Sequence, residues 1–200
     1  MENLFTNLHN DIKPLAERMR PTGLDDFVGQ RHILGEGKLL RRLIEAKRVP
    51  SCIFYGPPGT GKTTLARIIA ETTGGSFVMM NAISSGVAEV KVVIADAKKT
   101  FEMFGKKTYL LLDEVHRWSK AQSDSLVEVL ESGKLVLSGS TTESPTYSMT
   151  RSIVSRCSLF EFKPVETEDI KRALRRAIGA ENGLKAYRIQ IDGEALTYFA

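Results

Sequence analysis

The sequence Gly-Pro-Pro-Gly-Thr-Gly-Lys-Thr at residues 56–63 decides the fold. It matches at every position the phosphate-binding loop pattern, in which four residues separate a glycine from Gly-Lys and a final Ser or Thr. An apolar strand pattern precedes it at Cys52–Tyr55, and a helical pattern follows at Lys62–Thr73. In that setting the glycines let backbone N–H groups turn around a β-phosphate, and the helix N-terminus adds the positive end of its dipole. The alternative, a Gly/Pro turn that contains a lysine by chance, leaves the agreement between motif and setting unexplained.

Individual residues of this loop have distinct expected roles. We expect Lys62 to reach the β- and γ-phosphates of ATP, and the Thr63 hydroxyl to be a ligand of Mg²⁺. The loop residues that we expect to bind the nucleotide are Gly56, Pro57, Pro58, Gly59, Thr60, Gly61, Lys62, Thr63 and Thr64. Kinases, GTPases and oligomeric ATPases share such a loop, so the rest of the sequence has to distinguish them.

Two adjacent carboxylates end a second apolar strand pattern. The strand Thr108–Asp113 is followed at once by Glu114. Buried strands of parallel sheets end in polar residues where their carboxyl edge meets a ligand. We expect Asp113 to hold Mg²⁺ through its water shell and Glu114 to polarise the attacking water, which favours hydrolysis over transfer to another acceptor. Two solvated acids at a strand end are the structural alternative.

Polar residues near the acidic pair give weaker signals. A third strand pattern at 135–139 leads to Thr141 and Thr142, whose hydroxyls would bond a γ-phosphate or the lytic water, although such exits are commonly turns. His116 has no second His or Cys at metal-ligand spacing, and the acidic pair already supplies a base. We therefore favour a structural or substrate-side role for this histidine.

The order of the elements predicts an α/β fold with a mostly parallel sheet, because apolar strand patterns alternate with helical ones. The five expected strands are Cys52–Tyr55, Ser76–Asn81, Thr108–Asp113, 135–139 and 158–162. The expected helices are 38–48, Lys62–Thr73, Val87–Phe104 and a helix to Glu131 that opens with a capping box at Ser119 and stops at Gly133.

After residue 162 the pattern becomes helical only. Residues 163–165 are predicted to be a linker, and Thr167 to cap a helix with acidic residues in its first turn. Asp192 is predicted to cap a second, shorter helix. We therefore expect a five-stranded domain followed by the start of a helical one.

The composition is that of a globular protein. Of 200 residues, 42% are hydrophobic and 26% charged, which excludes a disordered tail, a collagen and a disulfide scaffold. The apolar runs are far shorter than the roughly 20 residues of a membrane span, and no secretory signal is visible. The two cysteines, Cys52 and Cys157, indicate reduced thiols in a cytosolic protein. A net charge of +4 permits an anionic partner such as nucleic acid without requiring one.

Taken together, these motifs resemble the AAA+ ATPases of the clamp-loader-like branch. The resemblance covers nearly the whole chain and is strongest to the replication-associated recombination protein A family (RarA, also called MgsA), the bacterial relatives of the Werner helicase-interacting ATPase. The segments that carry it, beside the phosphate loop, are 14–21 (PLAERMRP), 27–30 (FVGQ), 113–118 (DEVHRW), 141–145 (TTESP) and 155–157 (SRC).

The resemblance implies roles for residues outside the phosphate loop. Thr142 is similar to the sensor of the γ-phosphate, with Thr141 as the alternative. Arg156 is similar to an arginine finger that reaches the ATP site of a neighbouring subunit. Val28 and Gly29 are similar to a segment that contacts adenine. In this superfamily the sensor strand lies between the phosphate-loop strand and the acidic strand, which implies the sheet order 5-1-4-3-2.

Two further residues near the acidic pair have open roles. Asn81, at the end of the second strand, is a candidate to hydrogen-bond Glu114 and gate it. Trp118 is left between packing, a subunit contact and stacking on DNA.

The resemblance also implies a domain plan and an activity. Residues 1–20 would form an N-terminal segment, 21–164 the AAA+ ATPase α/β core, and 165–200 part of a helical lid domain. The implied function is a DNA-dependent ATPase of replication-fork maintenance, recombination and repair, with ATP and Mg²⁺ as cofactors and hydrolysis at subunit interfaces. The alternative is a clamp-loader-like or branch-migration-motor-like subunit whose output is nucleotide-switched partner binding. The implied partners are DNA forks, ends or single strands, further copies of the chain and replication proteins, in the cytoplasm at the nucleoid and without a membrane.

Contacts to DNA are expected near the start of the helix Val87–Phe104. By resemblance to clamp loaders, the candidates are Ser84, Ser85, Gly86 and Lys91. Such residues would contact phosphates without base specificity. Lys98 and Lys99 lie further along this helix and are expected to form an ordinary solvated face.

The last helical pattern is short, and the chain ends at Ala200. The helical domain of this superfamily usually carries a further arginine that contacts the γ-phosphate. Arg172, Arg175 and Arg176 lie on a different helix, so we expect that arginine to follow residue 200. The resemblance thus predicts the N-terminal ATPase part of a longer protein, with a remaining part that completes the lid and makes the homo-oligomer. Alone, the chain is expected to be largely monomeric with little turnover, since Arg156 has no neighbour to serve.

Overall fold

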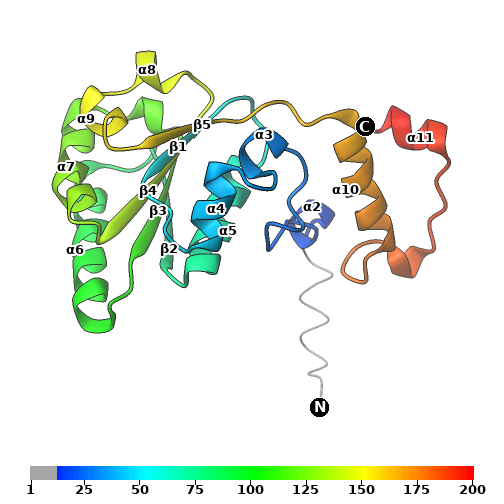
Figure 1. Cartoon of the computed structure of the whole chain (residues 1–200), viewed down its shortest axis with the longest axis horizontal. Helices are drawn as coiled ribbons and strands as arrows, with labels where there is room; N and C mark the ends of the chain where they lie inside the picture. The colour runs from blue at the N-terminus through cyan, green and yellow to red at the C-terminus, as the bar shows by residue number, and fades with distance from the viewer. Residues whose placement is uncertain (1–12) are drawn as a thin grey trace. The chain divides into compact units, whose positions relative to one another are not determined.

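The computed structural model describes residues 13–200, which form two compact units (Figure 1). The larger unit is Gln30–Pro164, and the smaller one combines residues 13–29 with Val165–Ala200. The sequence placed residues 21–29 in the larger unit, whereas in the structure they pack with the helices that follow Val165. Within residues 13–200, no helix combines the length and the apolar composition that a membrane crossing needs.

A five-stranded parallel sheet forms the centre of the larger unit. Its strands are β1 (Cys52–Tyr55), β2 (Ser76–Asn81), β3 (Thr108–Asp113), β4 (Leu135–Thr141) and β5 (Ser158–Glu161). Their order is β2-β3-β4-β1-β5, and every neighbouring pair is parallel, which confirms the predicted order. The chain leaves β1 toward one edge and returns as β5 on the other side of β1. Open α/β sheets bind ligands at the carboxyl ends of the strands where the order reverses in this way.

The inner strands of this sheet are more buried than its edges. Every residue of β4 is buried, as are all residues of β3 before Asp113, whereas the edge strands β2 and β5 are mostly half-exposed. Helices on both faces of a parallel sheet require near-continuous apolar runs in the inner strands. This burial explains why the sequence showed these strands so clearly.

Helices cover both faces of the sheet (Figure 1). The longer ones are α4 (Leu39–Glu45), α5 (Lys62–Thr73), α6 (Val87–Phe104) and α7 (Lys120–Glu131). The short ones are α3 (Arg31–Leu34), η1 (Val115–Arg117), α8 (Pro145–Ser148) and α9 (Arg151–Val154). The pair α4 and α5 packs on one face and the pair α6 and α7 on the other.

The core between the sheet and the pair α6 and α7 is apolar. Val90 of α6, Leu126 of α7 and Leu137 of β4 are fully buried members of one cluster. The helix α7 starts at the predicted capping box, because Ser119 Oγ accepts from the Gln122 N–H at 3.3 Å while Gln122 Oε1 accepts from the Ser119 N–H at 2.9 Å. Reciprocal bonds of this kind satisfy backbone donors that have no partner inside the helix.

Three boundaries in the larger unit differ from the sequence-based ones. β4 continues to Thr141, two residues beyond the expected end, because Ser140 and Thr141 still pair with β1. β5 ends at Glu161. α4 is shorter than the expected helix at 38–48, since Lys47 adopts a left-handed backbone with φ of 55° that ends the helical path.

The smaller unit is helical, as expected from residue 165 onward. Its elements are α2 (Leu15–Arg18), α10 (Thr167–Gly179), η2 (Lys185–Tyr187) and α11 (Gly193–Tyr198). The Asp192 carboxylate accepts from the Ala195 N–H at 2.7 Å, which confirms Asp192 as a helix cap. The prediction that Thr167 caps α10 is wrong, because the chain is extended only up to Glu166 and Thr167 is already helical.

Arg176 of α10 ties the segment 13–29 into the smaller unit. Its guanidinium donates to the carbonyl of Met19 and to the carbonyl of Asp26, both at 2.7 Å, and lies 3.2 Å from the Asp26 carboxylate. The Asn182 amide donates to the carbonyl of Arg18 at 2.9 Å. The contacts with Asp26 join residues 21–29 to α10, and those with Arg18 and Met19 join the preceding residues to the same unit.

We expect both cysteines to react slowly while the protein is folded. Burial raises the pKa of Cys52 on β1 and raises the pKa of Cys157 to about 12. The thiolate is the reactive form, so a raised pKa lowers the reactive fraction at pH 8. Iodoacetamide should label Cys157 on the order of 10²–10³-fold more slowly than a free thiol, with the rate rising about tenfold per pH unit. Mass spectrometry of the labelled protein, with a denatured sample as control, measures this; fast labelling of the folded chain at pH 8 would contradict it.

Candidate ATP site

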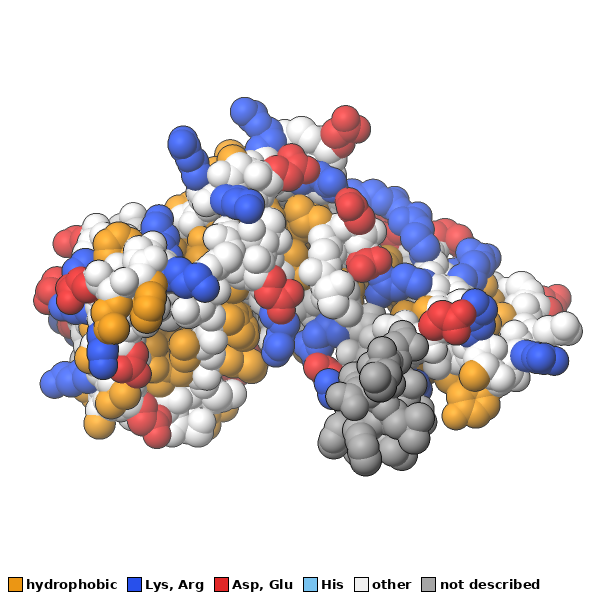
Figure 2. Space-filling view, turned by 90° about the horizontal axis from the view of Figure 1, so that it is seen from below, with side chains coloured by type: hydrophobic (Ala, Val, Ile, Leu, Met, Phe, Trp, Pro, Cys, Tyr) orange, Lys and Arg blue, Asp and Glu red, His pale blue; other side chains and the backbone are white. Residues whose placement is uncertain are grey.

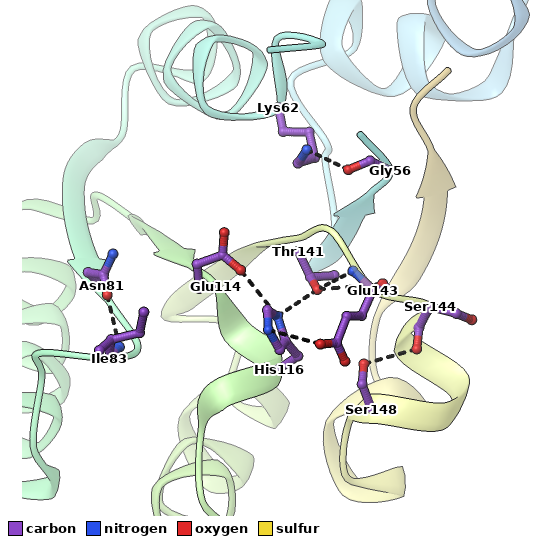
Figure 3. A network of polar contacts seen from close by, with 10 residues as sticks. All are labelled: Gly56, Lys62, Asn81, Ile83, Glu114, His116, Thr141, Glu143, Ser144 and Ser148. Carbon is purple, nitrogen blue, oxygen red and sulfur yellow. Dashed lines mark hydrogen bonds and ion pairs between the residues drawn. The ribbon is translucent and has the colours of Figure 1, made fainter. Parts of the chain in front are cut away.

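Three neighbouring strands bring the predicted site residues to one edge of the sheet (Figure 3). Tyr55 of β1 pairs with Thr141 of β4, and the N–H of Gly56 donates to the Thr141 carbonyl at 3.2 Å. Leu112 of β3 pairs with Gly139 of β4, so the acidic residues that follow Leu112 leave the sheet at the same edge. The parallel register therefore assembles the phosphate loop, the acidic pair and Thr141 side by side.

The phosphate loop depends on glycine at defined positions. Gly56, Gly59 and Gly61 have φ values of 136°, 73° and 97°, a region that residues with a side chain rarely adopt. A Cβ atom on Gly56 would lie 2.1 Å from the carbonyl oxygen of Phe162, so no side chain fits there. The glycines of the motif thus permit the backbone path that a cradle of N–H groups around a phosphate needs.

Lys62, the first residue of α5, is a buried cation inside this loop. Its Nζ donates to the carbonyl of Gly56 at 2.8 Å (Figure 3) and to that of Pro57, also at 2.8 Å. Burial lowers the pKa of Lys62, whereas the negative charges of Glu114 and Asp113 act in the opposite direction. The positive charge of Lys62 suits a triphosphate, and the negative charges of Glu114 and Asp113 suit Mg²⁺. A site for Mg·ATP needs both.

The acidic pair lies where β3 ends. Asp113 is the last strand residue, and Glu114 adopts a left-handed backbone with φ of 54° and ψ of 40°. This conformation is uncommon for a residue with a side chain and is found in strained functional segments. Both carboxylates are half-buried, and Thr63 in the first turn of α5 is half-buried as well. Asp113 and Thr63 supply the carboxylate and hydroxyl oxygens that Mg²⁺ prefers.

His116, for which the sequence predicted only a structural or substrate-side role, contacts three segments of this site. Its side chain is 4% exposed. The Nδ1 atom lies 2.9 Å from Thr141 Oγ1 and 3.3 Å from Glu114 Oε2, and the Nε2 atom lies 3.4 Å from Glu143 Oε1 (Figure 3). A lone histidine after an acidic pair carries no sequence signal for these contacts, because they depend on the neighbouring strand.

The expected hydrogen bond between Asn81 and Glu114 is not formed. Asn81 Oδ1 instead accepts from the N–H of Ile83 at 2.8 Å, while the Glu114 carboxylate faces His116 (Figure 3). A short turn after β2 therefore uses the Asn81 side chain locally.

The two sensor candidates have different surroundings. Thr141 ends β4, is 1% exposed, and its Oγ1 accepts from the Glu143 N–H at 3.0 Å in addition to its contact with His116. Thr142 lies one residue beyond the strand and is exposed. The assignment of the sensor to Thr142, with Thr141 as the alternative, stays a prediction.

Arg156 lies between α9 and β5, and its side chain is partly exposed. Its guanidinium donates to Glu131 Oε1 at 2.9 and 2.5 Å and to the Ser152 carbonyl at 2.8 Å. Its role in a neighbouring subunit stays a prediction.

Of the roles left open for Trp118, the structure supports packing, since this side chain is 7% exposed within the core cluster.

The segment 27–30 holds two predicted adenine contacts and Gln30, for which the sequence predicted no separate role. Val28 and Gly29 belong to the smaller unit, and their nucleotide role stays a prediction. Gln30 begins the larger unit and is 5% exposed. Its amide donates to the Lys163 carbonyl at 2.7 Å and accepts from the Lys163 N–H at 3.0 Å. Gln30 thereby fixes the segment after β5, whose Phe162 carbonyl faces Gly56, but a single glutamine has no sequence signature for this.

The fold and the site define a P-loop nucleotide-binding protein with a five-stranded parallel sheet. The family described as "ATPase family associated with various cellular activities (AAA)" matches residues 52–164, more than half of the chain. The chain belongs to this family, and the expected resemblance is confirmed.

Curated relatives are similar over almost the whole chain. Replication-associated recombination protein A of Bacillus subtilis is 41% identical over 190 residues, which cover 94% of this chain and 44% of that protein. The same-named protein of Escherichia coli K12 is 41% identical over 179 residues, covering 89% of this chain and 40% of that protein. ATPase WRNIP1 of Dictyostelium discoideum is 39% identical over 204 residues, covering 100% of this chain and 23% of that protein. The chain thus spans less than half the length of these relatives.

Solved structures are similar in fold. The Thermotoga maritima RuvB Holliday junction branch migration motor superposes with a TM-score of 0.71 at 23% identity, covering 90% of this chain and 58% of that chain. This similarity supports the AAA+ fold.

Proposed function

We propose that this chain is the ATPase part of a DNA-dependent AAA+ ATPase that acts in replication-fork maintenance, recombination and repair. The observation that carries the hydrolytic role is the convergence of the buried Lys62 with Asp113 and Glu114 at one sheet edge. The replication and recombination role is supported by relatives named replication-associated recombination protein A at about 41% identity.

Each residue of the site has a defined task in this proposal. The triphosphate of ATP lies on the loop 56–63, where Lys62 exchanges its two loop carbonyls for the β- and γ-phosphate oxygens. Thr63 and Asp113 would hold Mg²⁺, which would supply positive charge to offset that of the phosphates. Glu114 orients the attacking water and takes its proton. Thr142, or Thr141, bonds the γ-phosphate.

Hydrolysis at an interface between subunits is part of this proposal, with Arg156 as the residue supplied by the neighbour. Its guanidinium is partly exposed and pairs with the Glu131 carboxylate. A finger supplied by a neighbour stabilises charge on the transferred phosphoryl group. We therefore propose a homo-oligomer of the whole protein.

The proposed DNA contacts lie at the start of α6. Ser84 and Lys91 are exposed, the Ser85 carbonyl accepts from the Gln122 amide at 2.7 Å, and Gly86 is the N-cap of α6. The excess of Lys and Arg over Asp and Glu lies in the larger unit, since the two kinds balance in the described part of the smaller one. On the face shown in Figure 2 both signs are interspersed, so we propose a small number of phosphate contacts rather than a broad basic surface.

ATP hydrolysis with and without DNA ends, measured over a series of salt concentrations, tests this function. We expect DNA to raise the rate, and the stimulation to fall as salt rises. The Lys91→Ala variant should weaken the stimulation and reduce the salt slope by about one. Lys99→Ala is the matched control on the same helix and should behave as wild type.

The same assay distinguishes the DNA-dependent ATPase from the alternative function, a subunit whose output is partner binding. An ATPase rate that does not change with DNA but depends on different partner subunits would favour nucleotide-switched partner binding, as in a clamp-loader subunit or a branch-migration motor.

Lys98 is excluded from the DNA surface in our proposal, because its Nζ pairs with Glu128 Oε1 at 2.9 Å on a solvated face. A cytoplasmic location at the nucleoid, and contacts with replication proteins, follow from the proposed DNA partner.

A further inference from the structure

A buried histidine joins three segments at the hydrolysis site (Figure 3). Its ring contacts Glu114 at the exit of β3, Thr141 at the end of β4, and Glu143 in the turn that follows. The His116 side chain is 4% exposed, whereas those of Glu114 and Glu143 are 32% and 50% exposed. The ring is therefore buried in the protein, and the two carboxylates on either side of it reach solvent.

The Glu114 carboxylate has little else to hold it. Its backbone is set by the left-handed turn into η1, but several rotatable bonds separate that backbone from the carboxylate oxygens. Asn81 Oδ1 accepts from the N–H of Ile83 in the turn after β2, whereas Glu114 Oε2 lies 3.3 Å from His116 Nδ1. A general base that is free to rotate spends little time in the geometry needed for proton transfer.

A neutral imidazole has one N–H, which lies on either Nδ1 or Nε2. When Nδ1 carries the hydrogen, it donates to Thr141 Oγ1 at 2.9 Å, and this positively polarised edge of the ring faces Glu114 Oε2 at 3.3 Å. When Nε2 carries it, the N–H lies beside Glu143 Oε1, and Nδ1, which then has no hydrogen, accepts from the Thr141 hydroxyl, whose oxygen also accepts from the Glu143 N–H. The same contacts thus connect the end of β4 with the orientation of Glu114.

We propose that His116 is a positioning residue that holds the Glu114 carboxylate and couples it to Thr141 and Glu143. The inference rests on the proposed function, in which Glu114 is the base of ATP hydrolysis. His116 itself touches neither water nor phosphate in this proposal. It acts through Glu114, so its loss should reduce the rate of the chemical step and leave ATP binding unchanged.

Three substitutions of His116 in the native full-length protein test the inference. His116→Asn places an amide near the position of Nδ1, whereas His116→Gln places one near the position of Nε2. We expect His116→Ala to lower kcat about 10- to 100-fold with KM for ATP within about twofold. The His116→Asn variant should recover most of the wild-type kcat, whereas the His116→Gln variant should have a kcat as low as that of His116→Ala. Thermal unfolding and the Kd of a fluorescent ATP analogue show whether each variant is folded.

The results that would overturn the proposal are distinct from those that would overturn the proposed function. Wild-type kcat in all three variants, or kcat and ATP affinity that fall together in all three, would show that His116 only packs. A wild-type rate in Glu114→Gln would instead reject Glu114 as the base. If both ideas are correct, His116→Ala should have little further effect in a Glu114→Gln background, since the two residues act as a unit.

Discussion

Replacing Glu114 with Gln is expected to leave Mg·ATP binding intact and to lower turnover about 10²–10⁴-fold. The amide keeps the shape of the side chain at the exit of β3, but it cannot take a proton from water. Phosphate release under saturating ATP gives kcat, and titration with a fluorescent ATP analogue gives the Kd. Hydrolysis at the wild-type rate would reject the assignment of the base.

Lys62→Ala is the matched comparison, because it should lose binding itself. The Lys62 ammonium is a buried cation whose Nζ lies within hydrogen-bond distance of two loop carbonyls. Its removal takes away the positive charge that reaches the phosphates. A Glu114→Gln protein that binds ATP beside a Lys62→Ala protein that does not would separate chemistry from binding at one sheet edge.

Replacing Arg156 with Ala is expected to cut hydrolysis by roughly 10³–10⁵-fold, or about 4–7 kcal/mol of barrier, while ATP still binds. The ion pair with Glu131 does not oppose this role. Partly exposed pairs contribute only about 0–1 kcal/mol, so a phosphate in a neighbouring subunit competes easily for the guanidinium.

Mixing the Arg156→Ala and Lys62→Ala proteins distinguishes a finger that acts in a neighbour from one that acts in its own subunit. An interface in mixed assemblies can combine an intact ATP site from one subunit with an intact arginine from the other. Activity should therefore reappear in the mixture. Assemblies that exchange subunits and stay inactive would place Arg156 outside the neighbouring site.

Much of the fold follows from local sequence signals. The strands β1, β2 and β3 have the bounds that their apolar runs predicted, and α5, α6 and α7 have the bounds predicted by their apolar period and caps. The predicted end of β4 was wrong because pairing with a neighbouring strand sets it. β4 continues to Thr141 because β1 supplies two more pairing positions, and no residue of β4 itself signals this.

The site divides in the same way. The backbone of the phosphate loop is a local property of its glycines, and Lys62 and the acidic pair are recognisable because short motifs fix their residue types at fixed spacing. His116 and Gln30 depend on contacts with residues 25 and 133 positions away in the chain. Such contacts leave no pattern in one sequence, because any polar residue of suitable length satisfies the local spacing.

The sequence by itself therefore determined two things. Its family resemblance implied the sheet order, and its short motifs predicted the chemistry of the phosphate loop and the acidic pair. The tertiary structure decided which polar groups surround that chemistry. The parallel register places β3 and β4 side by side, so a buried ring from one strand exit meets the hydroxyl and carboxylate of the next. It also decided that residues 21–29 pack with α10, since Arg176 satisfies carbonyls far away in the chain. The reason is the same in both cases: the polar partner of each side chain lies far away in the chain, so the fold and not the local sequence brings the two together.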